Sequence, residues 1–156
     1  PGMAKCAGNY VNAHLIKREA QVNGYAEAVA LSPDGMVSEG SGQNIFVVRD
    51  GELVTPPING SNLQGLTRRA VLALAAEAGV PARVEPVTRE QLVVADELFF
   101  AGTATEVMPI RSLDRIAIGP DGGRRGPITE RLQKAFHDIV HGRVPDRFGW
   151  LSPVDA

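Results

Sequence analysis

The spacing of apolar residues changes several times along the chain, and each change predicts a different element. Between Gly8 and Val22 apolar residues recur at helical spacing among charged ones, which predicts an amphipathic helix. Further on, two Asp-Gly pairs each separate apolar runs, a pattern typical of β-hairpins and of an antiparallel sheet. The runs are residues 28–31 and 36–37 around the first pair, and 45–48 and 53–54 around the second.

The second half of the chain mixes helical and strand patterns. A helix is predicted from Thr67 to Ala78, with Thr67 as its cap and Gly79 closing it. Another is predicted from about Pro127 to His141, because its apolar residues share one face. Between them we expect a strand at 83–87, a helix at 89–93, an apolar strand at 97–100, and strands at 107–110 and 116–118 around a turn at 114–115. With a proline-rich loop at 55–60 and no internal repeat, one α+β domain is predicted.

Composition narrows the classes of function. A chain of 156 residues can bury one core, and 16 basic against 18 acidic residues give no basic surface for nucleic acid or lipid. A small-molecule function is therefore favoured. The single Cys6 cannot form an internal disulfide, and no clustered Cys and His indicate a metal site. No membrane-length apolar stretch or signal peptide is present, so we expect a cytoplasmic location.

One stretch, VSEGSGQNIF at residues 37–46, places a carboxylate in a glycine-rich turn just ahead of an apolar run. Gly40 and Gly42 permit backbone conformations and close approach to a ligand that a Cβ would forbid. Glu39 is the side chain that such a turn would present. Taken alone, it is equally well interpreted as a turn carboxylate that faces water.

Several segments together resemble one known family. Read in order, the segments resemble the class IV pyridoxal-phosphate enzymes, and most closely the branched-chain aminotransferases. They are AKCAGNY at residues 4–10, the glycine-rich stretch at 37–46, LTR at 66–68, GTATE at 102–106 and GWL at 149–151. The resemblance extends from Ala4 to about Val154. It implies the D-amino-acid aminotransferase-like fold, an antiparallel-rich sheet or pseudo-barrel with flanking helices.

The resemblance also implies how this sequence relates to a longer protein. Residues 1–156 match the larger, C-terminal, cofactor-binding domain. In the family a smaller N-terminal domain precedes the cofactor lysine, whereas here Lys5 follows the opening residues almost at once. We therefore expect that the smaller domain is absent, and that the chain was cut or proteolysed from a longer protein.

The resemblance assigns three residues to pyridoxal 5'-phosphate itself. Lys5 would carry the cofactor covalently and, once displaced by substrate, move the proton at the substrate α-carbon. On composition alone, a lysine near a terminus would be a solvated surface residue. Tyr10 would donate to the ring hydroxyl oxygen. Glu39 would keep the pyridine nitrogen protonated, because an adjacent carboxylate favours the cationic form.

Phosphate and substrate groups are assigned in the same way. Leu66 and Thr67 would bind the phosphate at a helix start, where backbone N–H groups are free, although any capping threonine gives the same pattern. Thr103 would add a hydroxyl and an amide, and the Thr103 and Ala104 amides would face the substrate α-carboxylate. Other polar residues are interpreted as structural or solvated: Asn44 as a loop organiser, Arg68 and Arg69 as solvated, and His14, His137 and His141 as lacking metal-ligand spacing.

The implied activity is transamination of leucine, isoleucine or valine with 2-oxoglutarate as amino acceptor, by a homodimer or higher homo-oligomer. Alternatives of the same fold are a D-amino-acid aminotransferase and an aminodeoxychorismate lyase. An alternative of another class is a non-catalytic fragment or interaction domain. The chain departs from the family at Gln43, where glutamate is commoner, at Gln64, where proline is common, and at Met108, where threonine is common.

Overall fold

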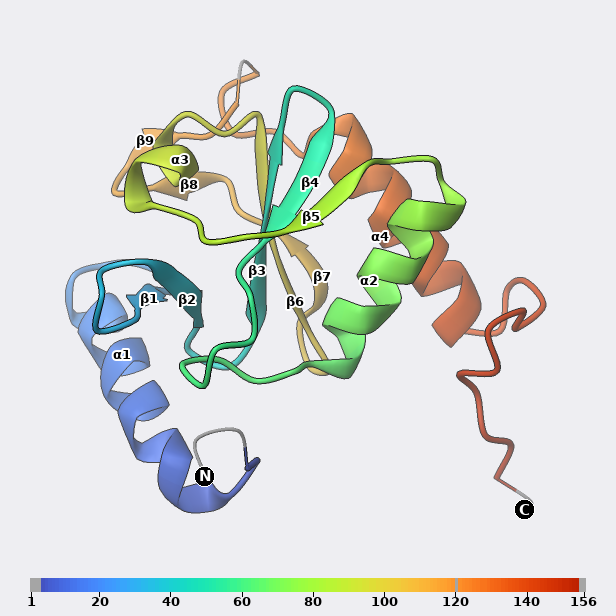
Figure 1. The fold of residues 1–156 in the computed structure, drawn as a ribbon, viewed down its shortest axis with the longest axis horizontal. Coiled ribbons are helices and arrows are strands. Elements are labelled where there is room, and N and C mark those ends of the chain that lie inside the picture. The colour runs from blue at the N-terminus through green and yellow to red at the C-terminus, as the bar shows by residue number, and fades with distance from the viewer. Residues whose placement is uncertain (1–3, 120, 155–156) are drawn as a thin grey trace.

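The fold of the computed structural model, which describes residues 4–119 and 121–154, is built around a five-stranded sheet (Figure 1). Its strand order is β5-β4-β3-β6-β7, and every pairing is antiparallel except that of β4 with β5. The strands are β3 (Asn44–Arg49), β4 (Glu52–Thr55), β5 (Ala82–Val84), β6 (Glu97–Gly102) and β7 (Glu106–Pro109). The predicted α+β class and mainly antiparallel sheet are confirmed.

The two central strands are buried on both faces, which explains their nearly continuous apolar sequences. Successive side chains of a strand point to opposite faces, so Phe46 and Val48 enter one core and Ile45 and Val47 the other. The rings of Phe46 and Phe99 stack across the β3–β6 pair with their centroids 4.9 Å apart. This pairing fixes the register of the strand that follows the glycine-rich turn.

Helices cover both faces of the sheet. Helices α2 (Leu66–Glu77) and α4 (Pro127–Val140) pack on one face, as Figure 1 shows. The other face is covered by α3 (Arg89–Val93) and the short pair β8 (Ser112–Leu113) and β9 (Ile116–Ala117). Helix α1 (Tyr10–Val22), preceded by the 3₁₀ turn η1 (Ala7–Asn9), lies beside the hairpin of β1 (Val29–Leu31) and β2 (Val37–Gly40).

Most predicted elements are confirmed, and three details were wrong. The turn at Asp114 and Arg115 joins β8 to β9, so the expected strand at 107–110 ends earlier and a separate strand was missed. Strand β5 is shorter than expected and runs parallel to β4. Thr67 does not cap α2, because Gly65 occupies the N-cap and Thr67 is the second helical residue.

A buried carboxylate fixes the start of α4. Glu97, on the central strand β6, accepts hydrogen bonds from the backbone N–H groups of Ile128 (3.0 Å) and Thr129 (2.6 Å). These are orphan donors of the first helical turn, and the N-cap residue Gly126 has no side chain to satisfy them. A negative charge at a helix N-terminus is also favoured by the helix dipole. Glu97 therefore anchors α4 to the sheet.

None of the helices within residues 4–119 and 121–154 is long and apolar enough to span a membrane.

Candidate active site

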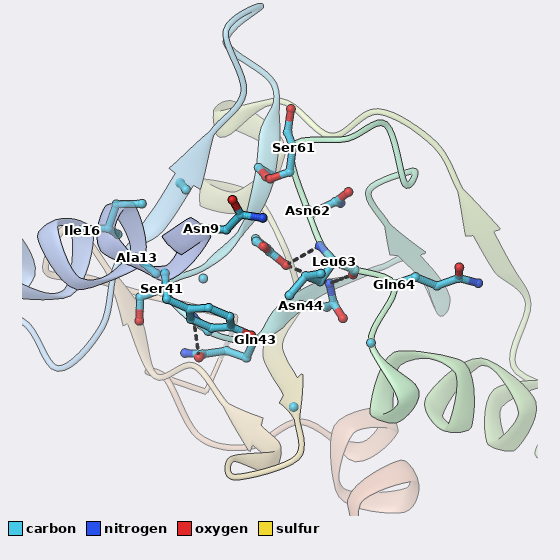
Figure 2. A pocket seen from close by; sticks show the side chains of 18 of the residues that line it. Asn9, Ala13, Ile16, Ser41, Gln43, Asn44, Ser61, Asn62, Leu63 and Gln64 are labelled. Carbon is cyan, nitrogen blue, oxygen red and sulfur yellow. Dashed lines mark hydrogen bonds between the residues drawn. The ribbon is translucent and has the colours of Figure 1, made fainter. Parts of the chain in front are cut away.

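A cavity of about 840 Å³ opens between α1, the turn after β2, the loop before α2 and the turn after β6. It lies within the usual size range of small-molecule sites. Figure 2 shows Ser41 and Gln43 on one side of this space and Asn62 and Gln64 on another. Six of the seven residues predicted for cofactor and substrate line it: Lys5, Tyr10, Glu39, Leu66, Thr67 and Thr103. Ala104 lies one residue beyond the lining, in the same turn.

Glu39 places a half-buried carboxylate in this cavity. Its Oε2 accepts hydrogen bonds from Asn44 Nδ2 (3.1 Å) and from the Leu63 backbone N–H (3.2 Å), which Figure 2 marks with dashed lines. Burial raises the pKa of Glu39 to about 7, although the hydrogen bond from Leu63 opposes the shift. The carboxyl is therefore poised to hold or release a proton near neutral pH.

Asn44 connects Glu39 to the loop that precedes α2. Its Nδ2 also donates to the Leu63 carbonyl oxygen at 2.8 Å, so one amide organises the loop as predicted and orients Glu39 as well. The loop passes so close that a Cβ at Gly65 would lie 2.2 Å from Asn44 Oδ1. Only glycine fits this approach, and the N-terminus of α2 is thereby held next to Glu39.

The start of α2 presents unused donors to the cavity. Gly65 provides no side-chain cap, so the first backbone N–H groups of the helix have no such partner. Leu66 and Thr67 line the cavity at this point, and the Thr67 side chain is almost fully buried. Since Thr67 does not serve as the cap, its hydroxyl is available for a ligand. A helix N-terminus of this kind suits an anion.

Arg68 was wrongly predicted to be solvated. It is 5% exposed, and its guanidinium donates to Thr55 Oγ1 (3.3 Å) and to the Pro56 carbonyl oxygen (3.0 Å). Burial lowers the pKa of Arg68 from its usual value. The signal was present in the sequence, because Arg68 shares a helical face with Val71 and Ala75, whereas Arg69 is exposed as expected.

The turn that carries Thr103 is fixed from α4. Glu106, at the end of this turn, has φ 52°, a left-handed conformation that is uncommon for a residue other than glycine. Its Oε2 lies 2.7 Å from His137 Nε2, and Gln133 Nε2 donates to the Val107 carbonyl oxygen at 2.7 Å. His137 therefore has the structural role that was one of its two predicted interpretations.

Among the described residues, no group of three or more His, Cys, Asp or Glu side chains is arranged to hold a metal ion. Cys6 is a free, exposed thiol.

The family model described as Amino-transferase class IV matches residues 4–113 of this chain. The chain belongs to the class IV aminotransferases. The matched region contains the cavity residues of α1, β2, the start of α2 and the turn after β6. Enzymes of this class use pyridoxal phosphate.

Individual class IV aminotransferases are similar along the whole chain. The branched-chain-amino-acid aminotransferase of Salmonella typhimurium is 46% identical over 156 residues, which cover 100% of this chain and 50% of that protein. The crystal structure of the Escherichia coli branched-chain amino acid aminotransferase has a TM-score of 0.94 at 46% identity, covering 99% of this chain and 50% of that one.

A third similar protein was solved in its holo-form. The crystal structure of the branched-chain amino acid aminotransferase from Thermobaculum terrenum, in the PLP-form, has a TM-score of 0.94 at 39% identity, covering 100% of this chain and 50% of that one. The present chain spans about half the length of the relatives it matches.

Proposed function

We propose that residues 1–156 are the cofactor-binding half of a pyridoxal-phosphate-dependent aminotransferase that acts on leucine, isoleucine and valine, with 2-oxoglutarate as acceptor. The relatives that support this substrate class are about twice as long as the chain, so the other half of such an enzyme would complete the site. We also propose a homodimer or higher homo-oligomer. The exposed apolar residues Val11 and Leu15 on α1 support further contacts there. A cytoplasmic location stays a prediction.

The observation that carries this proposal is the environment of Glu39. The pyridine nitrogen of the cofactor needs a carboxylate partner to stay protonated, and the half-buried Glu39 carboxyl lies in the cavity, where its negative charge would favour that cationic form. Asn44 and Leu63 orient the Glu39 oxygen from within the cavity. The residues present therefore fit the cofactor.

The remaining contacts follow from the cavity walls. The Thr67 hydroxyl and the free N–H groups at the start of α2 would bind the phosphate, with Thr103 adding a further donor. Tyr10 would donate to the ring hydroxyl oxygen. The backbone amides of Thr103 and Ala104 would face the substrate carboxylate, where small side chains leave the backbone accessible.

When bound, pyridoxal phosphate supplies an electron sink for the substrate α-carbon. Lys5 lines the same cavity as Glu39, where it would hold the cofactor and, as a free amine, move a proton to and from that carbon. Glu39 would hold the proton on the ring nitrogen. Lys5 and Glu39 would thus have separate roles. Lys5 precedes α1 and Glu39 lies on β2, so the two residues line the cavity from different segments.

The activity is tested directly by incubating the purified full-length protein that contains residues 1–156 with pyridoxal phosphate, 2-oxoglutarate and each amino acid, and measuring glutamate formation. We expect turnover with L-leucine, L-isoleucine and L-valine, and little with D-alanine. Turnover with D-alanine alone would favour the D-amino-acid enzyme, and pyruvate release from aminodeoxychorismate would favour the lyase. Absence of cofactor binding would favour a non-catalytic domain.

Thr67 and Thr103 are expected to act on cofactor affinity. Changing either residue to Val removes one hydroxyl donor to a charged acceptor, a loss of about 1.5–3 kcal/mol. Cofactor titration, followed by absorbance, should therefore show affinity weakened by roughly 10-fold or more. Thr129→Val is a matched control, because the buried Thr129 hydroxyl has no hydrogen-bond partner and lies outside the cavity lining. Equal affinity in all three variants would place the phosphate elsewhere.

A further inference from the structure

Gln43, which stands where the family more often has glutamate, lies at a junction of three segments. The residue is 8% exposed, and its Nε2 donates to Glu27 Oε2 at 2.8 Å. Its Oε1 accepts from the Gly42 backbone N–H at 3.1 Å, a contact that Figure 2 marks beside Ser41. Glu27 in turn accepts from Lys17 of α1 at 2.9 Å. Gln43 thus connects the turn after Glu39 to α1.

The same side chain packs close to two glycines that line the cavity. A Cβ at Gly40 would lie 3.1 Å from Gln43 Nε2, and a Cβ at Gly102 would lie 3.1 Å from Gln43 Cβ. Gly40 follows Glu39 directly, and Gly102 precedes Thr103 directly. The backbone segments that present the Glu39 carboxylate and the Thr103 donors are therefore both packed against Gln43.

We propose that Gln43 is a positioning residue that holds the Glu39 turn and the Thr103 turn in register, and that its neutral amide makes this junction insensitive to pH. The proposal rests on the proposed function for its consequence, which is cofactor affinity. The junction itself is a property of the chain and can be measured without cofactor.

Charge and hydrogen bonding both favour an amide at position 43. An amide N–H donates to Glu27, whereas an ionised glutamate at position 43 has no donor and would bring a second negative charge to the same contact. Lys17 supplies one positive charge, which balances Glu27 alone. Two carboxylates in contact hold a shared proton at low pH and repel each other once it is lost.

The groups around Glu27 keep it ionised in the present chain. Burial would raise the pKa of Glu27, but hydrogen bonds from Ala28, Gln43, Lys17 and Ser41 outweigh burial and hold that pKa below its usual value. Lys17 comes from α1, and Ser41 and Gln43 from the turn after β2. Glu27 thus stays a carboxylate through the neutral range, and the junction does not change with pH.

The test compares Gln43→Glu with the exchanged pair Glu27→Gln/Gln43→Glu, which again has one amide and one carboxylate. Amide hydrogen exchange of cofactor-free protein, measured by mass spectrometry on peptides covering 38–44 and 100–105, reports on both turns. In Gln43→Glu we expect exchange in both peptides to accelerate about tenfold relative to wild type at pH 8.5, after correction for intrinsic rates, and to match wild type at pH 5.5. The exchanged pair should match wild type at both values.

Cofactor titration gives the second measurement. The affinity ratio of Gln43→Glu to wild type should fall about tenfold between pH 5.5 and pH 8.5. Using the ratio removes the titration of Glu39, which all variants share. The exchanged pair should give a constant ratio near one.

The two measurements separate the two proposals. Exchange that is equal in wild type and Gln43→Glu at pH 8.5, or that accelerates in only one of the two peptides, would overturn the positioning role. The protein could also show the expected faster exchange in Gln43→Glu at pH 8.5 and yet bind no pyridoxal phosphate. That result would support the positioning role of Gln43 and contradict the proposed function. Because glutamate is the commoner family residue at this position, Gln43→Glu is expected to fold.

Discussion

Replacing Lys5 by Ala in the full-length protein should abolish covalent attachment of pyridoxal phosphate and reduce transamination by on the order of 10⁴-fold or more, the scale of losing a covalent nucleophile. The chain has three lysines, and the other two are engaged elsewhere. Lys17 bonds Glu27 and the Ala26 carbonyl oxygen, and Lys134 pairs with Asp138 on α4. Lys5 alone lines the cavity.

The measurement is borohydride reduction of cofactor-loaded protein, followed by peptide mass spectrometry. Wild type and the control Lys134→Ala should both carry the reduced cofactor at Lys5, because Lys134 lies outside the cavity. A reduced cofactor attached to the Lys5→Ala protein would show that another amine does this work, and the assignment would fail.

Replacing Glu39 by Gln should slow the chemical step by ~10²-fold or more while the cofactor still binds. Glutamine keeps an oxygen that can accept from Asn44 and Leu63, but it removes the charge that holds the ring nitrogen protonated. Single-turnover rates with L-leucine measure this step. The control is Glu19→Gln, since Glu19 is exposed on α1. Rates unchanged from wild type would exclude the ion pair.

The same variant should change how the stability of the cofactor-free protein depends on pH. The pKa of Glu39 is about 7 in the folded state against an ordinary value of 4.5, so its stabilising contribution is present below about 4.5 and is lost as pH rises through 7. Glutamine does not ionise, so the Glu39→Gln variant should not lose this stability as the pH rises. Its unfolding free energy should equal wild type at pH 4 and exceed it at pH 8 by on the order of 1 kcal/mol, allowing for partial exposure. Urea unfolding at both pH values tests this prediction. A difference in unfolding free energy between variant and wild type that is the same at both pH values would contradict it.

The elements with strong periodicity were predictable from the sequence. The α4 pattern placed Leu132, Phe136 and Ile139 on the core face, and all three are buried there. The Asp50-Gly51 pair predicted the β3–β4 hairpin because both residues adopt positive φ. The parallel β4–β5 pairing was not predictable, because it depends on how α2 returns the chain to the sheet.

The candidate site was likewise predictable only in part. Family segments predicted Lys5, Glu39 and Thr67 as site residues, and all three line the cavity. Contacts between distant segments were missed, as with the Glu27–Gln43 hydrogen bond, which joins residues 16 positions apart. Glu27 matches no motif, so the sequence gives no signal of its partner, and only the folded chain shows that these two polar groups meet.

The position of α4 along its own axis affects the candidate site. Glu97 holds its first turn, Gln133 reaches Val107, and His137 reaches Glu106 at the end of the Thr103 turn. A helix rises about 1.5 Å per residue, so a slip of one residue at Gly126 would carry His137 out of contact with Glu106. The buried carboxylate on β6 therefore determines, from the far end of a fourteen-residue helix, where the donors of the Thr103 turn lie.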